Sequence, residues 1–150
     1  MIPRPGFVLV VEDSDEDFDT VRDAARRAAL PHEIRRAATG DAALGLLGGW
    51  ERENHALPAL VLLDLNTPRG DGREVLRAIR ENPRLRALPL VVLSTSDNPR
   101  DLDFCYTSGA NAYHTKPLDY PAHLAVLQQI FHYWLTAVAL PGAVHLPSTP

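Results

Sequence analysis

Short apolar runs and apolar stripes at helical spacing alternate along almost the whole chain. The runs are rich in Val, Leu and Ile and predict five strands, at residues 7–11, 34–38, 60–63, 90–93 and 112–115. The stripes follow the strands and predict five helices, which begin near residues 14, 40, 71, 99 and 121. Five strand–helix units in series predict an α/β fold with a doubly wound, five-stranded parallel sheet and right-handed crossovers.

The second and the last of these helices carry further expectations. Gly48 and Gly49 are expected to end the second helix, which leaves residues 50–55 as a polar connection to the next strand. The last helix is expected to continue to about residue 138. One apolar stripe would cover the sheet and comprises Leu124, Leu127, Phe131 and Leu135.

Length and composition indicate one soluble globular domain over residues 1–150, with a core at about 7–135 and a C-terminal extension at about 136–150. The net charge of -4 and the lack of a basic cluster argue against nucleic-acid binding. No apolar stretch approaches the roughly 20 residues that span a membrane, and residues 1–6 have no apolar signal-peptide core. The single cysteine, Cys105, suits a reducing compartment and is expected to be a small buried residue. We therefore expect a cytoplasmic protein.

Acidic residues follow two of the predicted strands directly. Asp64 ends the run at residues 60–63, and Glu12 and Asp13 end the run at residues 7–11. Because the carboxyl ends of parallel strands meet at one edge of the sheet, the three acids should converge there. Their mutual repulsion is costly unless a proton or a cation relieves it. A metal site is the natural hypothesis, and oxygen ligands favour Mg²⁺.

Two further strand ends add a hydroxyl and a positive charge to the same edge. Ser94 follows the fourth strand and Lys116 the fifth. A carboxylate beside Mg²⁺ can attack phosphorus and form an aspartyl phosphate, while the ammonium and hydroxyl groups bind phosphoryl oxygens. Phosphoryl transfer depends mainly on positioning and charge neutralisation, which this set of residues provides.

The chain resembles the receiver domains of two-component response regulators, which have the flavodoxin-like, CheY-like fold. The resemblance covers about residues 7–135 and rests on five segments, which are residues 10–14, 62–68, 70–72, 91–96 and 115–117. It implies that Asp64 accepts the phosphoryl group. It implies Mg²⁺ ligation by Asp13, Asp64 and the backbone carbonyl of Asn66, with Glu12 acting through water.

The same resemblance implies roles for residues on the last two strands. Ser94 would be the switch hydroxyl, Lys116 the phosphate-pairing lysine and Tyr113 the aromatic rotamer switch. Thr95 stands where a smaller residue is usual, so access to the phosphate is expected to be narrower. The bond between Lys116 and Pro117 is expected to be cis.

Within the family, the segments at residues 50–58 and 133–135 look most like the small response regulators that are paired with bacterial phytochromes. The partner implied is a histidine kinase, and this narrower resemblance implies one of the phytochrome type. The chain would then be a single-domain signalling protein rather than an enzyme, with self-phosphorylation and autodephosphorylation as its only chemistry.

Other functions remain open on the residues alone. A haloacid-dehalogenase-like phosphatase also uses an aspartate after a strand, but it needs a second acid where this chain has Asn66. A nucleotide-binding enzyme would need a Gly-rich phosphate loop after the first strand, and this chain has none there. A phosphorylation-independent interaction module would not need the acid, hydroxyl and lysine set.

The last helix also offers an apolar surface beyond the stripe that covers the sheet. Its members are Ile130, Tyr133, Trp134 and Val138. Leaving several such residues in water is unfavourable for a monomer. The sequence therefore predicts a homodimer through the fourth helix, fifth strand, last helix and C-terminal extension, with a monomer whose tail covers its own patch as the alternative.

Overall fold

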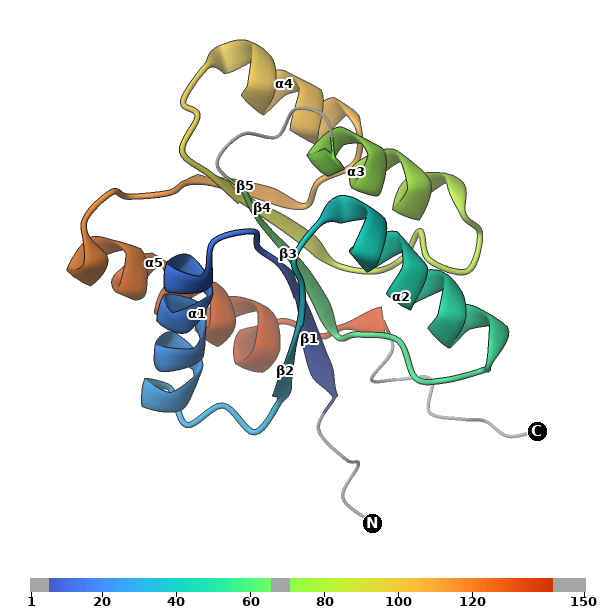
Figure 1. The fold of residues 1–150 in the computed structure, drawn as a ribbon, viewed down its shortest axis with the longest axis horizontal. Coiled ribbons are helices and arrows are strands. Elements are labelled where there is room, and N and C mark those ends of the chain that lie inside the picture. The colour runs from blue at the N-terminus through green and yellow to red at the C-terminus, as the bar shows by residue number, and fades with distance from the viewer. Residues whose placement is uncertain (1–5, 66–70, 142–150) are drawn as a thin grey trace.

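The computed structural model describes residues 6–65 and 71–141, which form alternating strands and helices (Figure 1). The strands are β1 (Phe7–Val11), β2 (Glu33–Ala37), β3 (Leu60–Leu65), β4 (Leu90–Ser94) and β5 (Ala112–Thr115). The helices are α1 (Asp15–Arg27), α2 (Gly40–Arg52), α3 (Asp71–Glu81), α4 (Pro99–Thr107) and α5 (Tyr120–His132), followed by a π-helical turn, η1 (Tyr133–Ala137). All strand pairs are parallel, in the order β2-β1-β3-β4-β5. The predicted doubly wound sheet is confirmed.

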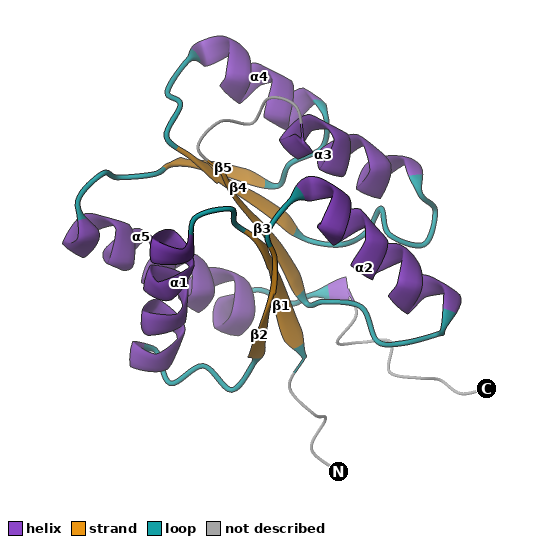
Figure 2. Cartoon of the chain, viewed as in Figure 1, coloured by secondary structure: helices purple, strands orange, loops and turns teal. Residues whose placement is uncertain are grey.

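Helices cover both faces of the sheet, with α1 and α5 on one face and α2, α3 and α4 on the other (Figures 1 and 2). Alternate residues of the central strands divide between the two layers. Val10 and Leu62 pack in the cluster that includes residues of α1 and α5, whereas Val11 and Leu63 pack in the cluster that includes residues of α2 and α3. Burial on both faces explains why β1 is apolar throughout and why β4 is apolar up to its last residue, Ser94.

Side-chain caps fix the helix starts next to the carboxyl edge of the sheet. The Ser14 hydroxyl accepts a hydrogen bond from the backbone N–H of Asp17 at 3.2 Å, and acids fill the first turn of α1. The Asp119 carboxylate accepts from the backbone N–H of Ala122 at 3.0 Å and begins α5. These caps hold the first turns of α1 and α5 in defined positions beside the strand ends.

The second helix is longer than predicted, because it continues through Gly48 and Gly49 to Arg52. Trp50 is therefore buried in the core instead of lying in a polar connection. Its ring meets the Phe7 ring edge-on, with the centroids 5.0 Å apart, and stacks on the His55 ring at 5.8 Å. Burial of this indole outweighs the roughly 1 kcal/mol that a helical glycine costs.

The last helix buries a wider face than predicted. Ile130 is only 1% exposed and packs with α1 residues as well as with the sheet, so its assignment to an outer dimer surface is wrong. Two neighbouring helical layers widen the buried stripe of α5 beyond what the sheet alone requires. Trp134 is partly buried against the same core, whereas Tyr133 is 55% exposed. The π-helical turn η1 then ends before Val138, whose backbone is extended.

The single cysteine is buried, as expected, and the described helices are too short or too polar to span a membrane. Cys105 is fully buried, and burial together with nearby Asp101 raises the pKa of its thiol to about 11, which keeps it protonated and unreactive. Within residues 6–65 and 71–141, no helix combines the length and apolar character needed to cross a membrane.

Candidate functional site

The carboxyl ends of β1, β3, β4 and β5 bring four of the predicted residues into one buried cluster. The register pairs Val11 with Leu63 and Ser94 with Thr115, so the residues that follow meet at the same edge of the sheet. The four side chains are almost inaccessible to solvent and are those of Glu12, Asp64, Ser94 and Lys116. The structure thus brings these four of the five predicted strand-end residues to one edge of the sheet, and the fifth, Asp13, is exposed.

The ammonium group of Lys116 is the electrostatic centre of this cluster. Its Nζ lies 2.7 Å from Asp64 Oδ1, 2.9 Å from Asp17 Oδ2 and 3.4 Å from Glu12 Oε1. Asp17, in the first turn of α1, was not among the predicted site residues, because an acid there looks like an ordinary partner for the helix dipole. One lysine therefore faces three carboxylates.

Crowding of these charges shifts two pKa values. Burial raises the pKa of Glu12 from 4.5 to about 9, with a further contribution from the neighbouring Asp64 charge. Burial alone would lower the pKa of Lys116, but the adjacent Asp64, Asp17 and Glu12 raise it above its ordinary value. At neutral pH, Glu12 is accordingly protonated and Lys116 is charged.

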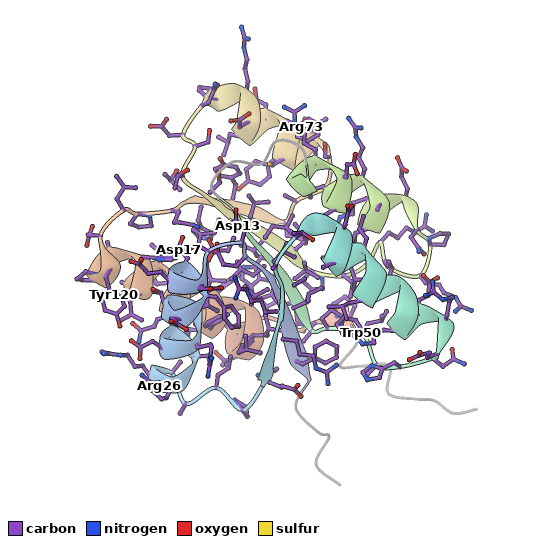
Figure 3. All side chains as sticks on the ribbon, viewed as in Figure 1. Asp13, Asp17, Arg26, Trp50, Arg73 and Tyr120 are labelled. Carbon is purple, nitrogen blue, oxygen red and sulfur yellow. The ribbon has the colours of Figure 1, made fainter. Side chains whose placement is uncertain are left out.

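The remaining predicted metal ligands have different surroundings. Asp13 is exposed at the end of β1 (Figure 3), and Asn66 lies outside the described residues. Among residues 6–65 and 71–141, no three His, Cys, Asp or Glu side chains are arranged as a metal-binding group. Lys116 instead supplies the cation next to Asp64. Neither oxygen of Asp64 accepts a well-formed hydrogen bond from the described part of the chain, although Oδ1 has its ion pair with Lys116.

The two remaining predicted residues lie beside the cluster. Thr95 is exposed directly after β4. Tyr113, on β5, is half-buried, and its hydroxyl donates a hydrogen bond to the backbone carbonyl of Ser96 at 2.6 Å. This bond joins the edge strand to the segment that follows Ser94. The predicted rotamer switch thus has a direct connection to the neighbourhood of the site.

His123 was missed by the sequence interpretation. It lies in the first turn of α5, is 4% exposed, and has its Nε2 3.7 Å from Asp64 Oδ2. Nε2 forms no hydrogen bond with any described residue. No local motif marks this histidine, because only the packing of α5 against the sheet places it next to Asp64.

The implied cis bond between Lys116 and Pro117 is a wrong expectation. No peptide bond within residues 6–65 and 71–141 is cis. The trans form is the intrinsically favoured one, even before proline.

Known proteins are similar to this chain in both sequence and fold. A family model for the response regulator receiver domain matches residues 8–128. Response regulator Rcp1 from Synechocystis sp. is 40% identical over 140 residues, which cover 93% of this chain and 95% of that protein. The crystal structure of the phosphorylated cyanobacterial phytochrome response regulator RcpA has a TM-score of 0.83 and 35% identity, covering 93% of this chain and 99% of that chain. The crystal structure of the Mn²⁺-bound form of Rcp1 has a TM-score of 0.82 and 40% identity, covering 91% and 99%.

The extent of these matches defines the class of protein. The chain belongs to the response regulator receiver domain family. The receiver fold and the resemblance to phytochrome response regulators, both predicted from the sequence, are confirmed.

Proposed function

We propose that Asp64 receives a phosphoryl group from a partner histidine kinase and that the protein signals by the resulting change in conformation. The observation that carries this proposal is the position of Asp64. It is fully buried at the carboxyl end of the central strand β3, with Lys116 Nζ 2.7 Å from Oδ1. Burying an unpaired carboxylate would cost free energy, and the ammonium group of Lys116 offsets the charge of Asp64. A role of Asp64 as phosphoacceptor explains why both charged groups are kept at this buried position.

The residues of the cluster have complementary roles in this chemistry. An oxygen of Asp64 attacks phosphorus while the bond between phosphorus and the donor breaks, and the electron pair of that bond leaves with the donor. Lys116 then exchanges part of its contact with carboxylates for the new phosphoryl oxygens. The hydroxyl of Ser94, at the end of the neighbouring strand, is our candidate donor to one of these oxygens.

We propose Mg²⁺ as the metal cofactor, held by Asp13, Asp64 and the Asn66 backbone carbonyl, with Glu12 acting through water. Two features of the site support the fit. Burial and the neighbouring Asp64 charge together raise the pKa of Glu12, and the Asp64 oxygens lack well-formed hydrogen bonds with the described residues. When bound, the ion would neutralise phosphoryl oxygens and favour ionised Glu12. The Mn²⁺-bound form of Rcp1 is consistent with this assignment.

The similarity to Rcp1 and RcpA leads us to propose a phytochrome-type histidine kinase as the partner. We also propose that residues 1–150 form a single cytoplasmic receiver domain that binds neither nucleic acid nor membrane. Its only chemistry would be self-phosphorylation and autodephosphorylation, so it would not act as an enzyme on other substrates.

A homodimer remains our proposal for the assembly, through α4, β5, α5 and the C-terminal extension. Ile130 is no longer a member of the contact surface because it belongs to the core. The remaining candidates are Tyr133, Trp134 and Val138. Tyr133 and Trp134 meet edge-on with centroids 5.3 Å apart and form an aromatic pair at the end of α5.

The phosphoacceptor is tested by incubating the protein with acetyl phosphate and Mg²⁺ and measuring its intact mass. The wild type should gain one phosphoryl group, whereas Asp64→Asn should remain folded and gain none. Asp103→Asn, which changes an exposed acid on α4, is the matched control and should be labelled like the wild type. Labelling of Asp64→Asn to a similar extent would show that the site is wrong.

Intact mass, together with an assay for phosphate release, separates the alternative functions. A phosphatase would release many equivalents of inorganic phosphate from a phosphate ester, and a phosphorylation-independent module would gain no phosphoryl mass at all. Either result would overturn the proposed receiver chemistry.

A further inference from the structure

We propose that His123 is a positioning residue for the phosphoacceptor, holding Asp64 Oδ2 while Lys116 holds Oδ1, and that it shortens the lifetime of phosphorylated Asp64. This inference rests on the proposed function of Asp64. Three observations carry it: the imidazole is 4% exposed, its Nε2 is 3.7 Å from Oδ2, and Nε2 has no hydrogen-bond partner among the described residues.

The position of His123 is fixed by the start of α5. Its backbone N–H donates to the carbonyl of Asp119 at 3.0 Å, and the Asp119 side chain caps the same turn. Pro121 lies in this first turn and restricts its backbone further. The backbone that carries the imidazole is therefore held firmly beside the sheet, and the burial of His123 restricts its ring.

His123 is one of the residues that line a groove between α1 and α5. The groove has a volume of about 610 Å³, and its lining includes Asp19, Arg22, Tyr120 and His123. Because His123 lines the groove and also faces the buried Asp64, the imidazole lies between the two. Figure 3 shows Tyr120 and Asp17 on the two helices that flank this groove.

The separation of 3.7 Å exceeds the usual 2.7–3.2 Å of an N–H···O bond. A small rotation of the Asp64 carboxylate would shorten this separation, and His123 Nε2 would then gain a hydrogen-bond partner. His123 occupies the space beside Oδ2, which leaves Oδ1 to carry the phosphoryl group. In the phosphorylated protein, Oδ2 is then the carbonyl oxygen of the acyl phosphate and still faces Nε2.

This arrangement favours loss of the phosphoryl group to water. The water oxygen attacks phosphorus, the bond between phosphorus and Oδ1 breaks, and its electron pair remains on the Asp64 carboxylate. The proton lost by the water goes to the phosphate product or to solvent. Negative charge returns to both carboxylate oxygens in this step, and an N–H donor at Oδ2 stabilises it.

The test compares three proteins that are phosphorylated with acetyl phosphate and Mg²⁺ and then freed of the donor by desalting. Decay of the phosphorylated mass should be about three- to tenfold slower in His123→Leu than in the wild type, the range expected for loss of one hydrogen bond. His123→Gln keeps an N–H donor and should decay at close to the wild-type rate. Both replacements retain most of the bulk of histidine between the groove and Asp64, so solvent access to Asp64 differs little between them.

The rescue by Gln distinguishes positioning from a purely structural role. Equal lifetimes in the wild type and His123→Leu would overturn the inference, as would a Gln variant as slow as Leu. If His123→Leu does not fold, NMR of the wild-type imidazole decides. An exchange-protected Nε2–H that shifts in Asp64→Ala supports the inference, and a freely exchanging one overturns it. A wild type that acquires no phosphoryl group refutes the proposed function itself, which is a different outcome from unchanged lifetimes.

Discussion

Three carboxylates compete for one ammonium group at the buried edge of the sheet. Lys116 contacts Asp64, Asp17 and Glu12, and it cannot neutralise all of them. A proton on Glu12 removes one of the three negative charges, in addition to the charge that Lys116 balances. Proton and metal should therefore compete at this site, which gives the site a measurable dependence on pH.

The free energy of unfolding of the metal-free protein should fall as pH rises from about 4.5 to about 9. Folding raises the pKa of Glu12, so over this window the native state holds a proton that the unfolded chain has lost. One such proton corresponds to a slope of at most roughly 1.4 kcal/mol per pH unit. Urea unfolding with a chelator present, at a series of pH values, measures it.

Glu12→Gln mimics the protonated side chain and should flatten this dependence. Glu53→Gln removes an exposed carboxylate and is the matched control, with the wild-type slope expected. If the wild type and Glu12→Gln respond identically to pH, Glu12 does not hold the proton.

Mg²⁺ should raise the melting temperature of the wild type, because a ligand that binds only the native state stabilises it by mass action. Asp13→Asn should gain less from the metal and should be slightly more stable than the wild type in the presence of a chelator. The modest size of the second effect follows from the exposure of Asp13. Thermal unfolding with and without Mg²⁺ checks both, with Asp103→Asn as control. An equal response of Asp13→Asn and wild type to Mg²⁺ would remove Asp13 from the ligand set.

Residues that follow strands were predictable individually, whereas contacts between distant helices were not. Asp64 and Lys116 could be assigned because parallel strands end at one edge of the sheet. Asp17 and His123 join the site through the packing of α1 and α5, which no sequence period encodes. A histidine on a helix gives no sign of which neighbour it will face.

At the scale of elements, strands and helix starts were predicted well because apolar runs and capping residues are local signals. Helix ends depended on tertiary packing. Trp50 extends α2 past two glycines by burying its ring against Phe7, and contact with α1 draws Ile130 into the core. The first error came from taking two glycines as the end of a helix, and the second from considering only the contact between α5 and the sheet.

Two glycines test the backbone conformation within α2 and in the turn after α4. Gly45 lies within α2, and a Cβ added there meets nothing within 4 Å, so Gly45→Ala should stabilise the protein by about 0.5–1 kcal/mol. Gly109, after α4, has φ +106°, and an added Cβ would lie 2.7 Å from Arg80 Cγ. Gly109→Ala should therefore be destabilising by roughly 1–3 kcal/mol. Urea unfolding of both variants measures the difference, and a destabilising Gly45→Ala would contradict a continuous α2.

At the scale of the whole molecule, α5 links the site to the far end of the domain. Its first turn places His123 beside Asp64, and its 13 residues span roughly 20 Å before η1 begins. Figure 1 shows this helix running along the layer it shares with α1. A change at the phosphoacceptor could therefore reach the exposed Tyr133, directly after α5, through a single helix.

The proposed homodimer is the prediction that depends on this far end of α5. Burying an exposed large apolar side chain contributes on the order of 1.5–3 kcal/mol, and a two-fold contact would bury Tyr133 on both chains. Tyr133→Glu should therefore weaken dimerisation strongly without affecting the fold, since this side chain is 55% exposed. Trp134→Glu is a poorer test because Trp134 also packs on the core.

The matched control is Leu46→Glu, which places the same charge on a partly exposed residue of α2, in the opposite layer. Light scattering should show dimers for the wild type and Leu46→Glu and monomers for Tyr133→Glu. A wild type that stays monomeric at high micromolar concentration would exclude the homodimer, and a monomeric Leu46→Glu would move the interface to the α2 face.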